Sequence, residues 1–318
     1  MASYVYAMGR RDRLAAIVDL LPGTLDKASF AERLPELSEV EVIFSTWGMP
    51  APTPQQLEAM PKLKAVFYAA GTVQQFARPL LQRGITVVSA WRANAVPVAE
   101  FALAQILLST KSYFANCDAY RTPKSFDQAP RGDGNFGQTV ALLGVGAIGR
   151  RVIELLKPFH LDVVVFDPYL SDEDAQAMGV RKVSLDAAFS EAIVVSNHLA
   201  NLPATIGMLR GSHFALLRKN ATFINTGRGA QVNEPEMIAA LRSRPDVYAL
   251  LDVTSPEPPV ASSPLWSMPN VRLSSHIAGS LGNEVVRMAD LVIEEFHRWD
   301  AGQPLQHQVT MEMLDRMA

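Results

Sequence analysis

One stretch, from Thr139 to Asp167, constrains the fold of this chain more than any other. Its centre is the run Gly144-Val145-Gly146-Ala147-Ile148-Gly149, which matches the pattern G-x-G-x-x-G. A short apolar run precedes these glycines, apolar residues at helical spacing follow them, and a second apolar run ends at Asp167. This order predicts a strand, a tight turn, a helix and a second strand, which is a unit of a doubly wound parallel sheet.

The glycines of this turn have the properties that binding of a dinucleotide requires. Gly144 allows the sharp turn, Gly146 lets the backbone approach a pyrophosphate, and Gly149 lets the helix pack closely on the strand. Free N–H groups at the start of the helix, around Ala147 and Ile148, would face the negative charge of the phosphates. The turn therefore predicts a dinucleotide cofactor.

The acid at the end of the second strand indicates which dinucleotide is bound. Asp167 can accept hydrogen bonds from both ribose hydroxyls, and its charge would repel a 2′-phosphate. The following residues, 168–174, contain three further acids and no Lys or Arg. The sequence therefore predicts NAD in preference to NADP.

Length and charge limit the remaining possibilities. A chain of 318 residues suggests about two domains. The net charge of −3 favours neither nucleic acid nor an anionic membrane as a partner. The N-terminal residues lack the apolar run of a signal peptide, and no apolar segment is long enough to span a bilayer, so a cytoplasmic location is expected. The single cysteine, Cys117, cannot form an internal disulfide, and no Cys/His cluster indicates a metal.

Strands and helices alternate along the chain in two blocks. In the first block, strands are expected at 4–7, 40–44, 65–68 and 85–88, with helices near 11–20, 54–60 and 73–83. A long apolar helix is predicted over 96–116, followed by an irregular connection at 121–138. The alternation restarts at 139 with about six parallel strands, and an amphipathic helix at 281–299 is expected to return to the first block. We therefore expect domains at 1–99, 100–280 and 281–318, the last belonging to the first.

Three polar side chains follow strands of the second block. Arg228 lies between glycines after a strand ending at Asn225, Glu257 lies in a proline-rich segment after another, and His276 follows the strand at 271–273. Each alone has an ordinary structural explanation, such as a turn cap, a solvated charge or a structural histidine. Parallel strands end at one edge of the sheet, however, so all three are expected beside the cofactor.

Together these residue types suit hydride transfer to a 2-oxo acid. A guanidinium can bind the substrate carboxylate through two parallel hydrogen bonds. A histidine can supply the proton that the new alkoxide requires, and a neighbouring carboxylate would orient the imidazole and favour its charged form. No metal is required. His198, at the same edge, is the main alternative to His276 as the acid, or else it lines the nicotinamide pocket.

These residues resemble the D-isomer-specific 2-hydroxyacid dehydrogenases. The similarity covers nearly the whole chain, and its most specific pieces are Leu143 to Arg150, Ile224 to Gly229, Leu251 to Pro258, and Asn270 to Gly279. It implies a Rossmann NAD domain and a flavodoxin-like substrate domain, with a cleft between them that closes by a hinge. Homodimers are usual in this family.

The resemblance also implies roles for single residues. Arg228 matches the substrate-binding arginine, Glu257 and His276 match the acid/base pair, and Asp167 matches the ribose acid. Positions near the nicotinamide are matched by Thr226 and Asp252. The turn that receives the substrate carboxylate is matched by the backbone of Ala70, Gly71 and Thr72.

The sequence departs from the family pattern in three places. Ala200-Asn201-Leu202 replaces a common P-L-T, Ser274-Ser275 precedes the catalytic position in place of T-P, and Thr254 replaces a common phenylalanine. These changes affect local loop shape. The family's formate dehydrogenases have glutamine at the position of Glu257, which argues against formate as the substrate here.

The predicted function is therefore NAD-dependent interconversion of a D-2-hydroxy acid and its 2-oxo acid. Two alternatives use the same fold: an NAD(H)-binding corepressor or sensor, and a phosphite dehydrogenase. The substrate side chain is expected to contact residues 47–49 and the segment around Trp91 and Arg92. Arg92 suggests a second anionic group on the substrate, although it is equally explained as a surface charge.

Overall fold

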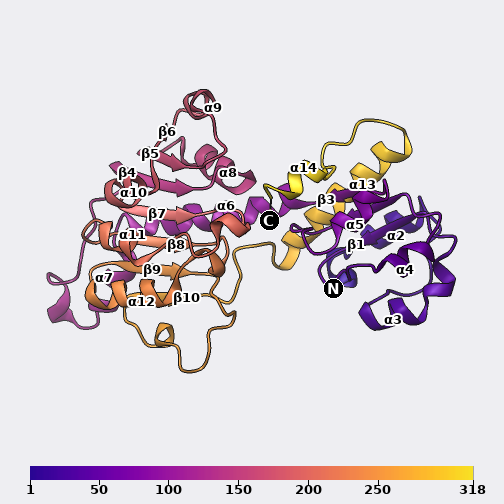
Figure 1. The fold of residues 1–318 in the computed structure, drawn as a ribbon. Coiled ribbons are helices and arrows are strands. Elements are labelled where there is room, and N and C mark those ends of the chain that lie inside the picture. Colours follow the sequence, from indigo (N-terminus) through magenta and orange to yellow (C-terminus); the bar gives the residue numbers. More distant parts are fainter. Residues whose placement is uncertain (318) are drawn as a thin grey trace. The chain divides into compact units, whose positions relative to one another are not determined.

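The computed structural model describes residues 1–317 and divides the chain into two compact units (Figure 1). Unit 1 comprises residues 1–95 together with the C-terminal residues from Ser280 on, and unit 2 comprises residues 96–279. Each unit is built on its own parallel sheet, flanked by helices. The predicted α/β class with two parallel sheets is confirmed.

Unit 2 is built on a seven-stranded sheet of order β10-β9-β8-β7-β4-β5-β6, in which all pairs are parallel. The strands are β4 (Phe136–Leu143), β5 (His160–Phe166), β6 (Arg181–Lys182), β7 (Val194–Asn197), β8 (Thr222–Asn225), β9 (Tyr248–Leu251) and β10 (Val271–Leu273). The chain leaves β4 toward β5 and later returns to its other side with β7, so the strand order reverses at β4. In open α/β sheets ligands bind at such a reversal, beside the carboxyl ends of the strands.

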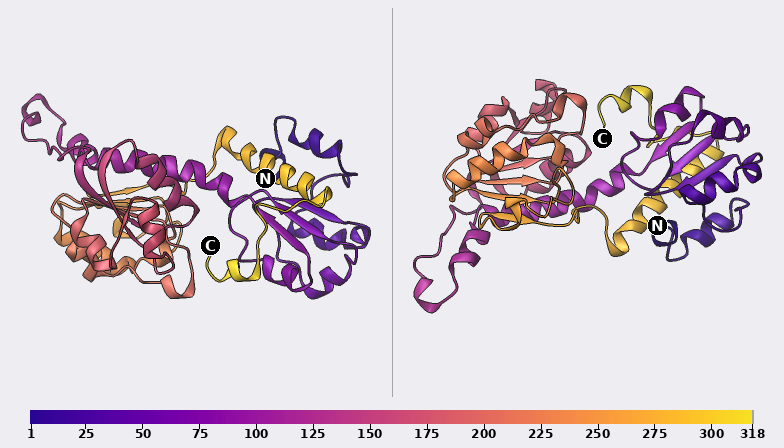
Figure 2. Two further views of the ribbon diagram at one scale, coloured as in Figure 1. Left: turned by 90° about the horizontal axis from the view of Figure 1, so that it is seen from above. Right: turned by 60° about the horizontal axis from the view of Figure 1, so that its bottom comes forward.

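The helices of unit 2 cover this sheet. They are α6 (Trp91–Ser109, beginning in unit 1), α7 (Tyr113–Ala119), α8 (Ala147–Leu156), α9 (Asp172–Ala177), α10 (Leu185–Glu191), α11 (Gly211–Leu216) and α12 (Glu234–Ser243). In α8 the buried residues Gly149, Val152, Ile153 and Leu156 recur at helical spacing, which turns one apolar face toward the sheet. Helix α11 packs against both α10 and α12. Figure 2 shows the segment after α7 projecting from the body of unit 2.

Unit 1 is built on a three-stranded parallel sheet of order β1-β2-β3. Its strands are β1 (Val42–Ser45), β2 (Ala65–Tyr68) and β3 (Thr86–Ser89). Every residue of β2 is buried, and its side chains alternate between two clusters: Ala65 and Phe67 belong to one, Val66 and Tyr68 to the other. Both faces of this central strand are therefore covered, as expected for a parallel sheet.

The helices of unit 1 supply those two covers. They are α1 (Ala2–Val5), α2 (Arg10–Ala15), α3 (Lys27–Glu32), α4 (Pro54–Glu58), α5 (Ala77–Gln82), α13 (Val286–Asp300) and α14 (Met311–Leu314). On one face, Phe296 of α13 packs edge-on against Phe67 at 5.5 Å between ring centroids. Leu57 of α4 and Leu80 of α5 belong to the cluster on the other face. Helix α13 thus completes the core of the unit that the N-terminal residues begin.

The strand predicted at 4–7 is wrong. Residues 2–5 form α1, and the buried side chains of Val5 and Tyr6 join the cluster that contains α13. The Tyr6 hydroxyl donates a hydrogen bond to the carbonyl of Ser45 at the end of β1. The strand propensity of Tyr and Val depends strongly on context, and packing on α13 overrides it here.

The single long helix predicted over 96–116 is also wrong. Helix α6 contains Pro97 and ends at Ser109, and α7 begins after Ser112. The φ of Ser112 is 54°, a left-handed value that interrupts the helix.

No single helix in residues 1–317 has the length and apolar character to cross a membrane. Helices α6 and α7 pass that test only as a pair, with a bend of 57° between them.

Candidate active site

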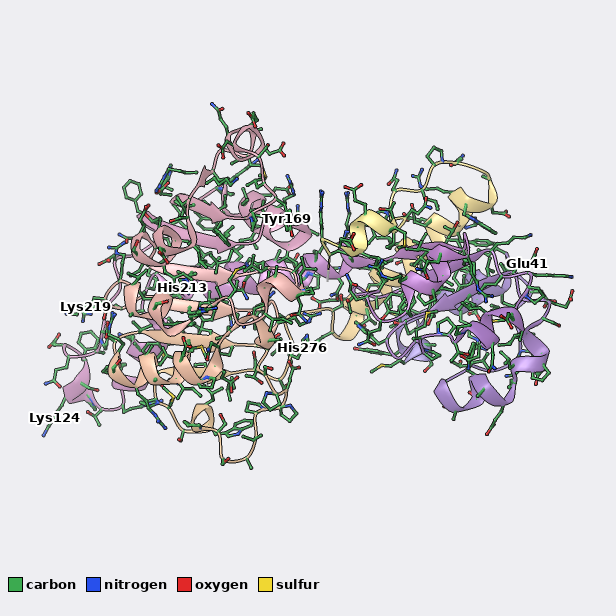
Figure 3. All side chains as sticks on the ribbon, in the orientation of Figure 1. Glu41, Lys124, Tyr169, His213, Lys219 and His276 are labelled. Atoms are coloured by element: carbon green, nitrogen blue, oxygen red, sulfur yellow. The ribbon has the colours of Figure 1, made fainter. Side chains whose placement is uncertain are left out.

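The predicted catalytic residues follow three adjacent strands of unit 2. Arg228 follows β8, Glu257 follows β9 and His276 follows β10. The order β10-β9-β8 places these strands side by side and parallel, so their following loops meet at one edge of the sheet. Figure 3 shows His276 and Lys219, which precedes β8, at opposite edges of unit 2.

His276 and Glu257 form a hydrogen-bonded pair. The Nδ1 atom of His276 lies 2.6 Å from Oε1 of Glu257, and the two side chains are 46% and 40% exposed. The carboxylate thus fixes the ring with Nδ1 toward Glu257 and leaves Nε2 for a ligand. Within residues 1–317 no group of three or more His, Cys, Asp or Glu side chains is arranged to hold a metal.

Arg228 is half-buried beside this pair. Burial lowers the pKa of the Arg228 guanidinium, and the negative charge of Glu257 opposes that shift, so the two groups interact electrostatically. The Nη1 atom donates to the carbonyl of Gly227 at 2.7 Å. In the described chain no second acceptor binds this guanidinium, which leaves donors for an incoming carboxylate.

Asp252 holds the loop that carries His276. Its buried carboxylate accepts hydrogen bonds from the hydroxyl of Ser274 at 2.6 Å and from the N–H groups of Ile277 and Ala278 at 2.8 and 2.9 Å. Its carbonyl accepts from the N–H of His276 at 3.1 Å. These bonds hold His276 at a φ of 57°, which few residues other than glycine adopt. The structure therefore shows Asp252 bound to this loop; its predicted contact with the nicotinamide stays a prediction.

His198 is buried, and both of its ring nitrogens have partners. Nε2 lies 2.9 Å from the hydroxyl of Ser196, and Nδ1 lies 3.1 Å from the hydroxyl of Thr226. Burial lowers the pKa of His198 to about 4. A histidine that is neutral at physiological pH and occupied on both sides is a poor proton donor, so the geometry favours His276 as the acid.

The glycine turn has room for a diphosphate. Gly144, at a φ of 89°, packs on the backbone of His198 and Leu199, and a Cβ on Gly149 would lie 2.1 Å from the carbonyl oxygen of Gly144. A Cβ on Gly146, by contrast, would meet no atom within 4 Å. Two glycines thus close the turn against protein, and the third faces open space at the start of α8. This arrangement fits a dinucleotide phosphate at the helix N-terminus.

Asp167 follows β5, next to this turn. Its Oδ2 accepts a hydrogen bond from the N–H of Val145 at 2.7 Å, and its Oδ1 accepts from the N–H of Tyr169 at 2.8 Å. Each carboxylate oxygen retains a second acceptor site. Asp167 is therefore fixed to the glycine turn and is still able to bind ribose hydroxyls.

In unit 1 the turn after β2 presents backbone donors. The carbonyl of Ala70 accepts from the hydroxyl of Ser89 and from the N–H of Ala90, and the Ser89 hydroxyl also contacts the carbonyl of Gly71. The carbonyls of the turn are thus bound within the protein. Among the described residues no acceptor binds the N–H groups of Gly71 and Thr72. Such free, neighbouring N–H groups favour an anion.

The residues expected near the substrate side chain also lie in unit 1. Trp47, Met49 and Trp91 are half-buried and pack against one hydrophobic cluster, whereas Arg92 is exposed. Trp47 and Met49 follow β1 and Trp91 follows β3, on either side of the turn after β2. The sheet order therefore brings these aromatic and apolar groups to the same edge as Gly71.

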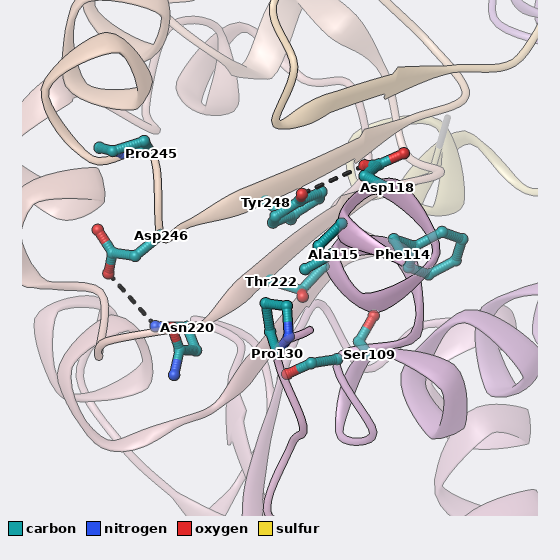
Figure 4. Close-up of a pocket in the computed structure, with 12 residues that line it drawn as sticks. Ser109, Phe114, Ala115, Asp118, Pro130, Asn220, Thr222, Pro245, Asp246 and Tyr248 are labelled. Atoms are coloured by element: carbon teal, nitrogen blue, oxygen red, sulfur yellow. Dashed lines mark hydrogen bonds between the residues drawn. The ribbon is translucent and has the colours of Figure 1, made fainter. Parts of the chain in front are cut away.

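One cavity of unit 2 lies away from these residues. It has a volume of about 320 Å³ and lies at the amino ends of β8 and β9, where Ser109, Asp118 and Tyr248 help to line it (Figure 4). The Tyr248 hydroxyl donates to Asp118 across its rim at 3.2 Å. Arg228 and Glu257 follow the carboxyl ends of these two strands, so this cavity is not the candidate active site.

Several residues of the site were missed by the sequence analysis. Ser196 and Ser274 bind groups that were predicted, and the buried amide of Gln231 binds the backbone of Arg228. A polar residue at the end of a buried strand, as at Ser196, is a usable signal. Gln231 lies in a short 3₁₀ turn, where no periodic pattern distinguishes it.

Comparison with known proteins places the chain in a family. The model of the NAD binding domain of the D-isomer specific 2-hydroxyacid dehydrogenases matches residues 100–278, which is more than half of the chain. The chain belongs to the D-isomer specific 2-hydroxyacid dehydrogenases. The family predicted from the sequence is thus confirmed, and NAD is the cofactor of its matched domain.

D-3-phosphoglycerate dehydrogenases are among the relatives of this chain. The chain is 27% identical over 234 residues to that of Archaeoglobus fulgidus, covering 74% of this chain and 44% of the relative. It is 31% identical over 248 residues to that of Mycobacterium tuberculosis strain H37Rv, covering 78% and 47%. The chain thus spans about half the length of the curated relatives it matches.

Solved structures of the family share the fold. The apo form of D-mandelate dehydrogenase from Rhodotorula graminis has a TM-score of 0.83 at 21% identity, covering 96% of this chain and 94% of that one. A phosphoglycerate oxidoreductase from Rhizobium etli has a TM-score of 0.79 at 22% identity, covering 98% and 95%. At such identities the likeness concerns the fold alone.

Proposed function

We propose that the protein is an NAD-dependent oxidoreductase that interconverts a D-2-hydroxy acid and its 2-oxo acid. One observation carries the proposal: the hydrogen-bonded pair of His276 and Glu257 stands beside Arg228 at the carboxyl edge of an NAD-binding sheet. A proton donor and a carboxylate-binding cation are the groups that reduction of a 2-oxo acid requires.

Each residue has one role in this proposal. Bound NADH supplies the hydride that reduces the carbonyl carbon. Arg228 binds the substrate carboxylate and polarises the carbonyl, and His276 donates a proton from Nε2 to the carbonyl oxygen. Glu257, bound to Nδ1 of His276, orients the ring. In the reverse direction His276 accepts the hydroxyl proton.

The turn after β2 supports the binding of an acid. The N–H groups of Gly71 and Thr72 are free donors in the described chain, and the bound carbonyls of Ala70 and Gly71 hold that turn in place. We propose that these amides are donors for an acidic substrate. Ser89→Ala removes the hydroxyl that binds these carbonyls, and the expected effect is a higher KM for the acid.

We propose that residues of unit 1 influence the choice of substrate. Relatives are named for phosphoglycerate, an acid with a second anionic group, and for mandelate, an aromatic acid. Arg92 is exposed, which leaves it available for a second anionic group, while Trp47, Met49 and Trp91 offer apolar contacts. If Arg92 binds such a group, Arg92→Ala lowers kcat/KM for hydroxypyruvate phosphate and not for pyruvate.

The test is oxidation of NADH by the purified protein with a panel of 2-oxo acids. The panel contains glyoxylate, pyruvate, hydroxypyruvate phosphate, phenylpyruvate and benzoylformate, and phosphite is tested with NAD⁺. The proposal is supported if the wild type reduces a 2-oxo acid and Arg228→Gln does not. NADH binding without turnover of any acid would instead indicate a sensor, and NADH formation from phosphite would indicate a phosphite dehydrogenase. Faster reduction of glyoxylate or pyruvate than of hydroxypyruvate phosphate would remove the role suggested for Arg92.

A further inference from the structure

Three buried amide side chains form a hydrogen-bonded network that contacts the backbone of Arg228. Asn197 at the end of β7 and Gln231 are fully buried, and Asn225 at the end of β8 is 1% exposed. Nδ2 of Asn197 donates to Oδ1 of Asn225 at 2.9 Å and to Oε1 of Gln231 at 2.7 Å. Buried amides in such a network are held in one orientation, because any rotation would leave a polar group without a partner.

Gln231 connects two backbone segments through this network. Its Oε1 accepts a second hydrogen bond, from the N–H of Arg228 at 3.1 Å. Its Nε2 donates to the carbonyl of Leu199 at 2.7 Å. Both acceptor sites of Oε1 are therefore used, and the side chain joins the backbone of Arg228 to the loop after β7.

The loop after β7 is a fixed anchor for this connection. The N–H of His198 donates to the carbonyl of Leu143 at 2.7 Å, and the N–H of Leu199 donates to Oδ1 of Asn197 at 3.2 Å. A Cβ on Gly144 would lie 2.8 Å from Cα of Leu199, so the glycine turn packs directly on this loop. The loop therefore stays in place without Gln231.

The backbone on both sides of Arg228 has little freedom. A Cβ on Gly227 would lie 2.7 Å from Oε1 of Gln231 and 2.9 Å from Nδ2 of Asn197. A Cβ on Gly229 would lie 2.0 Å from the carbonyl carbon of Thr254. The glycines thus allow the backbone to contact the amide network on one side and the segment leading to Glu257 on the other.

We propose that Gln231 is a positioning residue that sets the place of the Arg228 guanidinium relative to His276. The proposal rests on the role of Arg228 in the proposed function. Because Gln231 holds the main chain of Arg228 against an independently fixed loop, its loss moves the guanidinium and leaves the nucleotide turn intact. The consequence is weaker substrate binding with unchanged cofactor binding.

The test compares Gln231→Met with a matched control. Met has a similar length and cannot replace the hydrogen bonds to Arg228 and Leu199. Asn270 is a buried amide in the same unit whose Nδ2 donates to the carbonyls of Leu241, Arg244 and Val247, away from the site, so Asn270→Leu removes a similar network. We expect Gln231→Met to raise KM for the best 2-oxo acid about tenfold, with the Kd for NADH within about twofold of wild type. Asn270→Leu should lower Tm and leave that KM unchanged.

A second measurement does not depend on turnover. Hydrogen exchange of the segment 226–229 should be faster in Gln231→Met than in wild type and in Asn270→Leu, since the N–H of Arg228 loses its acceptor. If Gln231→Met does not fold, Gly227→Ala replaces it, because its methyl group would displace the Gln231 amide. An unchanged KM in the folded variant, or an equal rise in Asn270→Leu, would overturn the proposal. If wild type reduces no 2-oxo acid, the proposed function fails, and the exchange data alone decide on the positioning by Gln231.

Discussion

The imidazole of His276 and the carboxylate of Glu257 meet at 2.6 Å although 19 positions separate them in the chain. Each follows a different strand, β10 and β9, and the parallel pairing of those strands brings them together. Asp252 adds the hydrogen bonds that hold His276 at its left-handed φ. The pair is thus a product of sheet topology, and its chemistry can be tested residue by residue.

Loss of the imidazole should remove the proton donor and spare the cofactor. We expect His276→Ala to lower kcat for 2-oxo acid reduction by ~10²–10⁴-fold, the usual contribution of general acid catalysis, with NADH binding unchanged. Steady-state kinetics and titration of NADH fluorescence measure the two effects. His160→Ala is the control, because this exposed histidine begins β5 at the opposite edge of the same sheet. Turnover near wild type in His276→Ala would refute the assignment.

The carboxylate of Glu257 should hold the imidazole of His276 in place. Glu257→Ala removes the acceptor that lies 2.6 Å from Nδ1 of His276, so the ring loses its fixed orientation. We expect kcat for 2-oxo acid reduction to fall by about tenfold or more, with the Kd for NADH unchanged. Glu257→Gln, which keeps a hydrogen-bonding group for Nδ1, should lose less. Steady-state kinetics of both variants measure this, and a wild-type kcat in Glu257→Ala would mean that Glu257 does not position His276.

Substrate binding should depend on the planar shape of the Arg228 guanidinium more than on its charge. Arg228→Lys keeps the charge and loses the planar pair of donors that bind a carboxylate in parallel. A loss of one charge-assisted hydrogen bond, about 1.5–3 kcal/mol, corresponds to a rise in KM on the order of tenfold to a hundredfold. The measurement is KM for the best 2-oxo acid in the presence of saturating NADH. A KM that stays at the wild-type value would show that the guanidinium does not bind substrate.

Alanine substitutions at two glycines of the nucleotide turn should affect different properties, NADH binding in one case and stability in the other. Gly146→Ala adds a methyl group in open space, so Tm should stay within about 1 °C of wild type while the Kd for NADH rises at least about tenfold. Gly149→Ala places a methyl 2.1 Å from the carbonyl oxygen of Gly144 and should lower Tm clearly. Thermal denaturation and NADH titration separate the two. Equal loss of stability in both variants would contradict the view that Gly146 faces the diphosphate.

Asp167 should control the choice between NAD and NADP. Asp167→Asn keeps an acceptor for the N–H of Val145 and removes the charge that would repel a 2′-phosphate. The ratio of kcat/KM for NADH to that for NADPH should fall by about tenfold or more. Initial rates with both cofactors measure it. A wild-type protein that uses NADPH as well as NADH would already contradict the predicted preference.

His198 should make the fold less stable at acid pH. Its pKa is lowered from 6.5 to about 4, so between these values the unfolded chain binds a proton that the native protein does not. The contribution of the neutral ring is fully present above pH 6.5 and is lost as the pH falls toward 4, and it amounts to about 3 kcal/mol. His198→Gln should thus be less stable than wild type at pH 7.5, and the difference should shrink at pH 5. Urea denaturation at both pH values measures it; a constant difference would show that His198 does not titrate in this way.

The local features of this protein could be read from its sequence. The run from Gly144 to Gly149 and the acid at Asp167 predicted a strand, a turn and a helix, because glycine spacing and apolar periodicity act over neighbouring residues. The edge shared by Arg228, Glu257 and His276 could also be predicted, since parallel strands end on the same side. These inferences depend only on local pattern and on a general rule of sheet topology.

Tertiary structure decided what depends on burial and on partners distant in the chain. The neutral state of His198 results from its burial, where Ser196 of β7 and Thr226 after β8 bind its two ring nitrogens. The role proposed for Gln231 rests on a contact with Leu199 across 32 positions. Residues 4–7 avoid strand pairing because α13, nearly 300 residues later, covers Val5. Desolvation and hydrogen-bond geometry arise only when such segments meet, so no local pattern encodes them.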